Sequence, residues 1–208
     1  MKRLFGPLAL ATACVGCGGG SAGSAPPVTA NGSDDARVLD VTAAMGTPHV
    51  GDSAPDFELV DQNGAHVKLS NLRGSVVVLA FVTSWCPFSK AEQPYLRAMA
   101  EEYAAKNVKF LAVDVNEPEK GYREYLARVP MPFPVVSDAD AKTTLSYTPP
   151  GAQPSFTDRS RAIVTSSLVL DSKGTIRFFG LVDTAHFDAK FVHARKAVDS
   201  LLAEAPPK

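Results

Sequence analysis

Residues 76–90 read VVVLAFVTSWCPFSK, a continuous apolar run followed by a Trp-Cys-Pro step. An apolar run of this kind is typical of a strand buried on both faces of a sheet, and it predicts a central strand over residues 76–82. The Trp-Cys-Pro step opens an amphipathic pattern that predicts a helix over residues 87–106, kinked at Pro94. Cys86 is therefore expected between the end of a buried strand and the first turn of a helix.

Cys86 is the one cysteine in the part of the chain that is predicted to fold. Backbone N–H groups and the helix dipole favour negative charge at the first turn of a helix. We therefore expect its thiol to ionise more easily than that of a free cysteine, and the thiolate is the reactive form. A buried and inert cysteine is the alternative. A dithiol motif would carry a second cysteine three residues later, where this chain has Ser89.

The composition is that of a globular protein, with 45% hydrophobic and 21% charged residues among 208. This length allows one domain of ordinary size with additional segments. The net charge is −1 and the sequence shows no basic patch, so nucleic acid is not expected as a partner. The sequence also has no stretch of about 18 apolar residues that would span a bilayer as a helix.

The first 17 residues have the pattern of a secretory signal. Lys2 and Arg3 precede an apolar run at residues 4–13, which is too short for a membrane span. The cysteines that follow resemble the lipobox of bacterial lipoproteins, in which a cysteine is lipidated and becomes the mature N-terminus. Cys17 is the favoured lipidation site and Cys14 the alternative, and an ordinary cleaved signal is also open. The pattern predicts an exported, membrane-anchored lipoprotein that faces the periplasm or the cell exterior.

Residues 18–48 are rich in Gly, Ser, Ala and Pro and cannot bury enough apolar surface to fold. They are predicted to be a flexible tether between the lipid anchor and a folded domain over residues 49–208. Export would place that domain in an oxidising compartment. Cys86 has no second cysteine in its own domain, so it is expected as a free thiol, a mixed disulfide or an oxidised acid.

The folded part is predicted to contain strands and helices in the order β-β-β-α-β-α-β-α-β-β-α. Helices between buried strands favour an α/β fold with a central mixed β-sheet flanked by helices, preceded by an N-terminal β-hairpin. Outside residues 76–106 we predict hairpin strands at 56–60 and 66–69, strands at 108–113, 133–136, 163–164 together with 167–170, and 175–181, and helices at 122–128, from 138, and at 184–204. The first helix is predicted to bury Tyr95, Leu96, Met99 and Tyr103, and the last to bury Phe187, Phe191, Ala194, Val198 and Leu201.

Several short motifs resemble those of the thioredoxin-like superfamily. They are APDFEL at 54–59, DQNG at 61–64, LSNLRG at 69–74, WCP at 85–87, FPVVSD at 133–138 and LVLDSKG at 168–174. The nearest branches are the exported thiol:disulfide reductases of the TlpA and ResA kind and the peroxiredoxins of the AhpC/TSA, or redoxin, type. The resemblance covers residues 49–183 and implies a thioredoxin-like fold with Cys86 as its active-site cysteine.

The reductase branch implies thiol–disulfide exchange, which needs an accessible thiolate at Cys86. In that branch a second cysteine would stand at Ser89, and the helix would continue much as KAEQP does at residues 90–94. A glutamate at the position of Glu92 would tune the thiol, and a solvated helix carboxylate is the alternative. Ser89 cannot resolve a mixed disulfide, although its hydroxyl is expected to hydrogen-bond the thiolate. An external thiol is therefore needed.

The peroxiredoxin branch implies peroxide reduction by the same sulfur, again with an external reductant. Thr83 matches the threonine whose hydroxyl would hold the peroxide. The proline of that branch is Leu79 here, and its arginine position is Thr165, which is also where thioredoxins place a cis-proline. Arg161 or Arg159 is the candidate substitute for that arginine.

Two further classes remain open. Copper chaperones of the same fold use two cysteines and a histidine, and none of the four histidines here is paired with Cys86 by spacing, so neither a metal nor a cofactor is expected. A degenerate redoxin domain that only binds a partner is the non-enzyme alternative.

We predict an exported thioredoxin-like redox protein that uses a single cysteine for thiol–disulfide exchange. Its expected partners are an external thiol reductant or a disulfide-bearing protein, with peroxide as the other substrate and the membrane as the site of its lipid anchor. The candidate catalytic residues are Thr83, Trp85, Cys86, Ser89 and Glu92, and the candidate substrate-binding residues are Pro87, Arg161 and Thr165.

Overall fold

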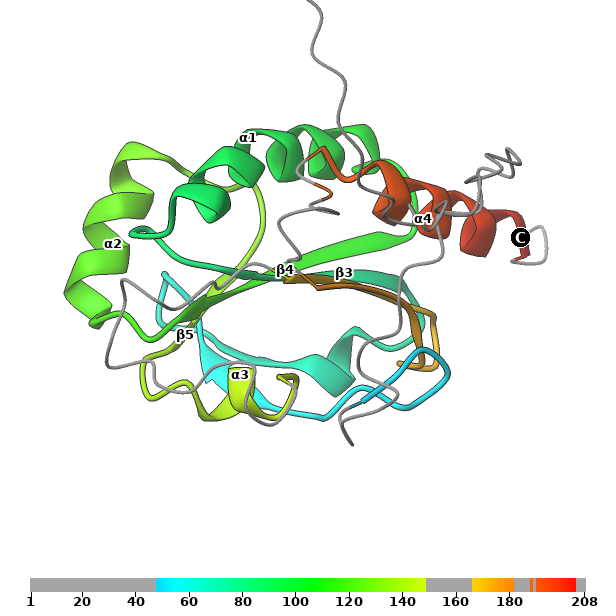
Figure 1. The fold of residues 1–208 in the computed structure, drawn as a ribbon, viewed down its shortest axis with the longest axis horizontal. Helices are drawn as coiled ribbons and strands as arrows, with labels where there is room; N and C mark the ends of the chain where they lie inside the picture. The colour runs from blue at the N-terminus through cyan, green and yellow to red at the C-terminus, as the bar shows by residue number, and fades with distance from the viewer. Residues whose placement is uncertain (1–47, 149–165, 182–187, 189, 205–208) are drawn as a thin grey trace, which may run out of the picture. The chain divides into compact units, whose positions relative to one another are not determined.

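The computed structural model describes residues 48–148, 166–181, 188 and 190–204 (Figure 1). The chain divides into two compact units, residues 1–36 and 37–208, and all of the described residues belong to the second. Cys14 and Cys17, with the predicted signal peptide, lie outside the described residues, as do Arg161 and Thr165. The same holds for the predicted tether apart from its last residue. The predicted boundaries after residues 17 and 48 therefore stay predictions.

A five-stranded mixed sheet forms the centre of the described unit. Its strands are β3 (Val76–Val82), β4 (Val108–Val115), β5 (Val135–Asp138), β6 (Ser166–Leu170) and β7 (Ile176–Leu181), in the spatial order β5-β4-β3-β6-β7. β4 pairs parallel with both β3 and β5, whereas β6 pairs antiparallel with β3 and β7. β3 is central, and all of its residues are buried, as its continuous apolar run predicts.

Helices and a hairpin cover the two faces of this sheet (Figure 1). α1 (Pro87–Glu102) and α4 (Val192–Glu204) lie on one face, and the short α3 (Lys142–Leu145) lies on the other. α2 (Glu119–Arg128) connects β4 to β5. The hairpin of β1 (Glu58–Val60) and β2 (His66–Lys68), followed by a 3-10 turn at Leu69–Leu72, packs on the same face as α3.

The side chains of β3 alternate between two apolar clusters, because successive strand residues point to opposite faces. Val78 and Ala80 belong to the cluster under α1 and α4, whereas Leu79 and Phe81 belong to the cluster under the hairpin. Burial on both faces fixes β3 inside the molecule, and the short segment after Val82 leads from it to the start of α1 at Pro87. The predicted fold class, a mixed sheet flanked by helices with an N-terminal hairpin, is confirmed.

α1 differs from its predicted form in two respects. It continues through Pro94 but ends at Glu102, rather than at residue 106. Tyr95 is 40% exposed, so its predicted place on the buried face is wrong. Tyr95 lies about 100° around the helix from Leu96, which puts it outside the buried stripe that Leu96 shares with Met99.

The prediction of one continuous helix over residues 184–204 is also wrong. α4 begins at Val192, because Phe191 has a φ of 56°, a left-handed conformation through which a right-handed helix does not continue. The Asp188 carboxylate accepts hydrogen bonds from three backbone N–H groups at the start of α4, at 2.7, 2.9 and 3.3 Å. These bonds satisfy donors that have no partner within the helix. Phe187 lies outside the described residues.

The other bounds move by a few residues. β4 ends at Val115 instead of residue 113, α2 begins at Glu119 instead of residue 122, and β5 spans Val135–Asp138 instead of residues 133–136. α3 begins at Lys142 instead of residue 138, and its N-cap residue is Ala141 rather than Asp138. The Asp138 carboxylate still accepts from the backbone N–H groups of Thr143 and Thr144 in the first turn, at 3.2 and 2.7 Å.

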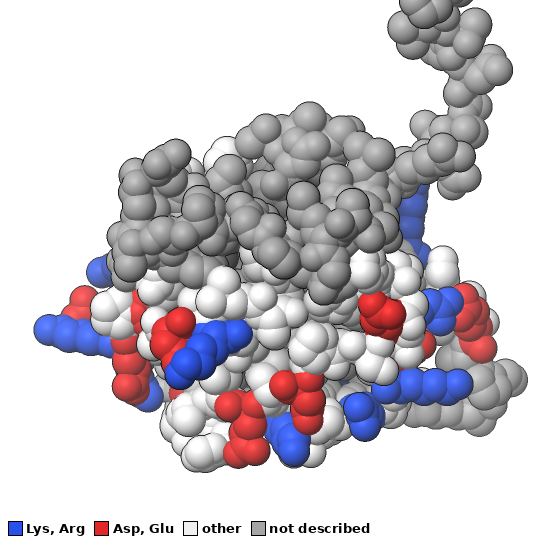
Figure 2. All heavy atoms as spheres, turned by 60° about the horizontal axis from the view of Figure 1, so that its bottom comes forward, with Lys and Arg blue, Asp and Glu red and all other residues white. Residues whose placement is uncertain are grey.

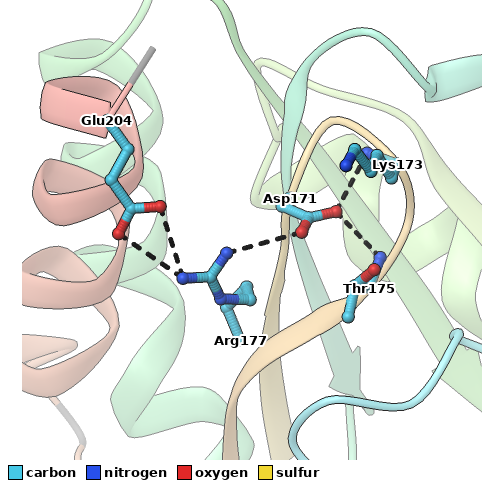
Figure 3. Close-up of polar contacts among 5 residues, drawn as sticks. All are labelled: Asp171, Lys173, Thr175, Arg177 and Glu204. Carbon is cyan, nitrogen blue, oxygen red and sulfur yellow. Dashed lines mark hydrogen bonds and ion pairs between the residues drawn. The ribbon is translucent and has the colours of Figure 1, made fainter.

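An ion-pair network joins the end of α4 to the β6–β7 hairpin (Figure 3). The Arg177 guanidinium lies 3.5 Å from the Asp171 carboxylate and 3.3 Å from the Glu204 carboxylate. Asp171 also accepts hydrogen bonds from the backbone N–H groups of Lys173 and Thr175, at 2.9 and 3.0 Å, which close the predicted turn.

The described surface in Figure 2 carries charges of both signs. Lys and Arg side chains lie among Asp and Glu side chains on this face, and neither sign forms a large separate area there. No helix in the described part of the chain has both the length and the apolar character that a membrane crossing requires.

Candidate active site

Cys86 lies at the junction between β3 and α1. It is the N-cap residue of α1, with backbone angles φ −80° and ψ 125°, and Pro87 occupies the first helical turn. Proline is favoured there because its missing N–H would have no partner inside the helix. The predicted place of this cysteine, between a buried strand and the first turn of a helix, is confirmed.

The side chain of Cys86 is buried. The residue is only 3% exposed, and it forms no disulfide. The accessible sulfur that exchange chemistry requires is therefore not present in this conformation. A partner reaches the sulfur only when neighbouring residues move.

Thr83 shapes the turn that leads from β3 to Cys86. Its side chain is fully buried, and Oγ1 accepts hydrogen bonds from the backbone N–H groups of Trp85 and Cys86, at 3.0 and 3.3 Å. A hydroxyl that bonds backbone N–H groups two and three residues later is a local turn-forming contact. The resemblance to peroxiredoxins implies that this hydroxyl holds a peroxide. In the structure its oxygen accepts from the two backbone N–H groups, and the contact with peroxide stays a prediction.

Ser89 lies in the first turn of α1 and is fully buried. Its Oγ accepts a hydrogen bond from the backbone N–H of Thr83, at 2.9 Å. The Ser89 oxygen is thus an acceptor for Thr83, and the predicted donation of its O–H to the Cys86 thiolate stays a prediction. The bond between Ser89 and Thr83 ties the end of β3 to α1 and satisfies a buried donor that would otherwise have no partner.

Trp85 and Pro87 flank the cysteine. Trp85 is partly buried and packs against the apolar cluster under the hairpin, whereas Pro87 is exposed. Of the two, Pro87 is the one that presents surface to an approaching partner. The role of either residue in substrate binding stays a prediction.

Glu92 is a buried carboxyl on the same helix. It is 7% exposed, so the interpretation of a solvated helix carboxylate is wrong. The pKa of Glu92 is raised to about 8, mainly by burial and in addition by the nearby negative charge of Asp188. Glu92 follows Ser89 by three residues, so both lie on the buried side of α1.

Glu117 is a site residue that the sequence analysis missed. It is 6% exposed, and its Oε2 accepts a hydrogen bond from the backbone N–H of Ser84 at 3.1 Å, while the Ser84 hydroxyl donates to Oε1. A usable signal was present, because Glu117 follows β4 closely and β4 is parallel to β3. The carboxyl ends of adjacent parallel strands meet at one edge of a sheet, where functional residues gather.

Gln93 was missed as well. It is 3% exposed on α1, and its side-chain oxygen accepts a hydrogen bond from the Tyr125 hydroxyl of α2. A small, mainly apolar pocket lies beside this contact, lined among others by Thr83, Ser84 and Asp114. The bond fixes α2, which follows Glu117, to the helix that carries Cys86 at its start.

Other predicted site residues cannot be placed. Arg161 and Thr165 lie outside the described residues, so their roles in substrate binding stay predictions. Within the described ranges, His, Cys, Asp and Glu form no group of three or more that would hold a metal ion.

The fold and this site together define a class of protein. A mixed sheet with a cysteine where the central strand meets the following helix is the arrangement of thioredoxin-like proteins. The chain belongs to the AhpC/TSA family, whose model matches residues 50–179.

Relatives with known names match a shorter region. The chain is 36% identical over 98 residues to the thiol-disulfide oxidoreductase ResA of Geobacillus kaustophilus, which covers 47% of this chain and 56% of that protein. It is 34% identical over 97 residues to ResA of Bacillus subtilis, covering 47% and 54%. The chain thus spans about half the length of the curated relatives it matches.

Solved structures confirm the thioredoxin-like fold. A DsbE-type thiol:disulfide interchange protein from Chlorobium tepidum has a TM-score of 0.59 at 28% identity, over 73% of this chain and 99% of that one. Peroxidoxin BcpB from Mycobacterium tuberculosis has a TM-score of 0.59 at 23% identity, over 76% and 98%. The second likeness shows the fold alone.

Proposed function

We propose that this protein is a thiol–disulfide oxidoreductase in which Cys86 is the single reactive sulfur. The observation that carries the proposal is the position of Cys86 as N-cap of α1, directly after the central strand. The similarity to relatives named thiol-disulfide oxidoreductase ResA supports the same chemistry.

The reaction proceeds in two balanced steps. The Cys86 thiolate attacks one sulfur of a partner disulfide, forms a mixed disulfide with it and releases the other sulfur as a thiolate. A second, external thiolate then attacks the partner sulfur of the mixed disulfide. Cys86 leaves as thiolate, the external thiol is joined to the partner sulfur, and no cofactor takes part.

The external thiol follows from Ser89. A dithiol enzyme resolves its mixed disulfide with its own second sulfur. In this chain the corresponding residue is Ser89, whose hydroxyl is bonded to the Thr83 N–H and cannot form a disulfide. A small-molecule thiol, or a cysteine of the reductant or substrate protein, must supply the second step. Because Cys86 is 3% exposed, its partner must also displace part of the surroundings of the sulfur.

Glu92 is the proposed tuning residue of this site. Its buried carboxyl lies on α1, and its raised pKa of about 8 means that it holds a proton at neutral pH. A protonated carboxyl is able to donate its proton to a thiolate formed during the reaction. An ionised carboxylate has no proton to donate.

A one-cysteine peroxidase is the second candidate function. The observation in its favour is the Thr83 hydroxyl, whose oxygen lies 3.3 Å from the Cys86 backbone nitrogen. In this reaction the thiolate attacks one peroxide oxygen, the O–O bond breaks, and the products are an alcohol or water and a cysteine sulfenic acid. External thiols would return the sulfenic acid to the thiol. A redoxin domain that only binds a partner is the non-enzyme alternative.

We further propose that the protein is exported and anchored by lipid. Residues 1–17 serve as signal peptide and lipobox, residues 18–48 as tether, and residues 49–208 as the redox domain. The lipid is attached at Cys17, or at Cys14, and the domain faces the periplasm or the cell exterior. Its partner would then be a disulfide-bearing protein of an oxidising compartment.

A turnover assay tests the proposed reaction. Full-length protein is mixed with a peptide disulfide and excess glutathione, or with hydrogen peroxide and glutathione in a second arm. We expect turnover of the disulfide that Cys86→Ser abolishes, and that a variant with serine at positions 14 and 17 retains. Turnover confined to peroxide would replace exchange by peroxidase function, and turnover in neither arm would leave the binding module.

A further inference from the structure

We propose that Glu117 is a positioning residue for Cys86. Its carboxylate holds the segment Ser84–Cys86, here called the cysteine loop, against the end of β4, and so sets how far the thiol is exposed. The relevance of this contact to the reaction rests on the proposed function of Cys86, whereas the contact itself is tested separately below.

All three backbone N–H groups of the cysteine loop are bonded to side chains. Those of Trp85 and Cys86 donate to Thr83 Oγ1, at 3.0 and 3.3 Å. That of Ser84 donates to Glu117 Oε2 at 3.1 Å. Thr83 precedes the loop directly, so Glu117 provides the tie between these N–H groups and a distant part of the chain.

Two hydrogen bonds join Ser84 to Glu117. The Ser84 hydroxyl donates to the second carboxylate oxygen, so one side chain bonds two groups of the same residue. Glu117 is 6% exposed, which leaves water little access to compete for its oxygens.

Glu117 is itself held by the sheet. The preceding residue, Asn116, has a φ of 50°, a left-handed conformation that asparagine adopts more readily than most residues. Its backbone N–H donates to the Asp138 carbonyl at the end of β5, at 3.0 Å. The turn that presents Glu117 is thus fixed to the neighbouring strand.

The glycine in α2 fits this arrangement. A Cβ at Gly121 would lie 3.0 Å from Glu117 Oε1 and 3.5 Å from its Cγ. Glycine is unfavourable inside a helix. At this position it leaves room for the buried carboxylate.

Alkylation of Cys86 tests the proposal. Full-length protein and its Glu117→Ala, Glu117→Gln and Ser84→Ala variants are treated with iodoacetamide, and peptide mass spectrometry follows the label on Cys86. We expect Glu117→Ala to react at least about tenfold faster, because the released loop opens more often and exposes the sulfur. Glu117→Gln should stay within about threefold of the wild type, since its amide can accept from the Ser84 N–H and donate to the hydroxyl.

Two results would overturn the proposal. One is a Glu117→Ala protein that reacts no faster than the wild type. The other is a Glu117→Gln protein that reacts as fast as Glu117→Ala, which would assign the effect to charge and not to hydrogen bonds.

Hydrogen exchange of the β3 amides controls for loss of the fold, because these amides should stay protected in every variant. If Glu117→Ala fails to fold, Ser84→Ala decides, since it removes only the hydroxyl bond and should accelerate alkylation by a smaller factor. An unaltered Ser84→Ala rate would then contradict the proposal. Faster alkylation of Glu117→Ala in a protein without disulfide turnover would keep the positioning role and reject the proposed function.

Discussion

At the scale of single residues, Ser89 combines a structural contact with the place of a second thiol. Its hydroxyl accepts from the Thr83 N–H and lies in the first turn of the helix that Cys86 caps. The same side chain therefore leaves the site without a resolving sulfur and holds the turn at the end of β3 in place.

We expect Ser89→Ala to lower the free energy of unfolding by about 1–3 kcal/mol, because it leaves the buried Thr83 N–H without an acceptor. Urea unfolding measures the change. The matched control is Ser146→Ala, which removes an exposed hydroxyl bonded to the Thr143 carbonyl and should have a smaller effect. An equal effect of the two substitutions would contradict this account of Ser89.

Glu92 predicts a pH dependence of stability. Its pKa is raised from 4.5 to about 8 in the folded protein, mainly by burial and further by Asp188. Between these values the folded state binds the proton and the unfolded state has released it, so the stability from Glu92 is present at low pH and falls as the pH rises through about 8. Each unit of difference in pKa corresponds to about 1.4 kcal/mol.

Glu92→Gln should remove this dependence. In urea unfolding, the variant should gain stability relative to the wild type as the pH rises from about 5 to about 9. Glu124→Gln, at an exposed position on α2, should show no such gain. A constant difference between Glu92→Gln and the wild type over this range would contradict the raised pKa.

At the scale of elements, local patterns account for what the sequence predicted correctly. The apolar run of β3 and the Cys-Pro step of α1 are contiguous, so strand, helix and the place of Cys86 followed from neighbouring residues. The contact of Ser84 with Glu117 joins residues 33 positions apart. The burial of Cys86 likewise depends on packing against residues that are distant in the sequence, so it could not be predicted from the residues around position 86.

The start of α4 shows the same limit of local patterns. The apolar spacing around Phe191 continues that of the helix, and Phe191 is buried, but its left-handed backbone lies before the first turn. The spacing identified a buried side chain correctly and its secondary structure wrongly. An aspartate that accepts from the first backbone N–H groups is a common sign of a helix start, and Asp188 has this role before Val192. The prediction followed the apolar spacing instead and therefore began the helix too early.

A substitution in α2 tests whether Glu117 holds the cysteine loop, because Gly121 lies next to the Glu117 carboxylate. Replacing glycine by alanine inside a helix normally stabilises it by about 1 kcal/mol. We expect Gly121→Ala to lack that gain and to accelerate alkylation of Cys86, because the new Cβ would lie 3.0 Å from Glu117 Oε1. Ala127→Gly, at an exposed position of α2, is the control and should lose the ordinary amount. Ordinary stabilisation with unaltered alkylation would contradict the tight contact.

At the scale of the whole molecule, the redox domain is proposed to work at the end of a tether. The AhpC/TSA match lies within residues 50–179, and the proposed lipid site lies at Cys17 or Cys14. A tether of flexible composition would let the domain reach membrane-bound partners while it stays at the membrane.

Membrane retention tests the anchor. We expect Cys17→Ser to release the protein from membranes after fractionation, because a lipid chain that is not attached cannot insert. Release by Cys14→Ser alone would move the lipidation site to Cys14. Full retention of both single variants and of the double variant would contradict the anchor.

The central claim is that Cys86 forms mixed disulfides. The most direct measurement is peptide mass spectrometry of the full-length protein after incubation with oxidised glutathione, with Cys86→Ser as the control. We predict one glutathionyl group on the Cys86 peptide, lost on addition of excess thiol and absent from the control. A Cys86 peptide that stays unmodified until the protein is denatured would contradict the claim and would mark the cysteine as an inert part of the core.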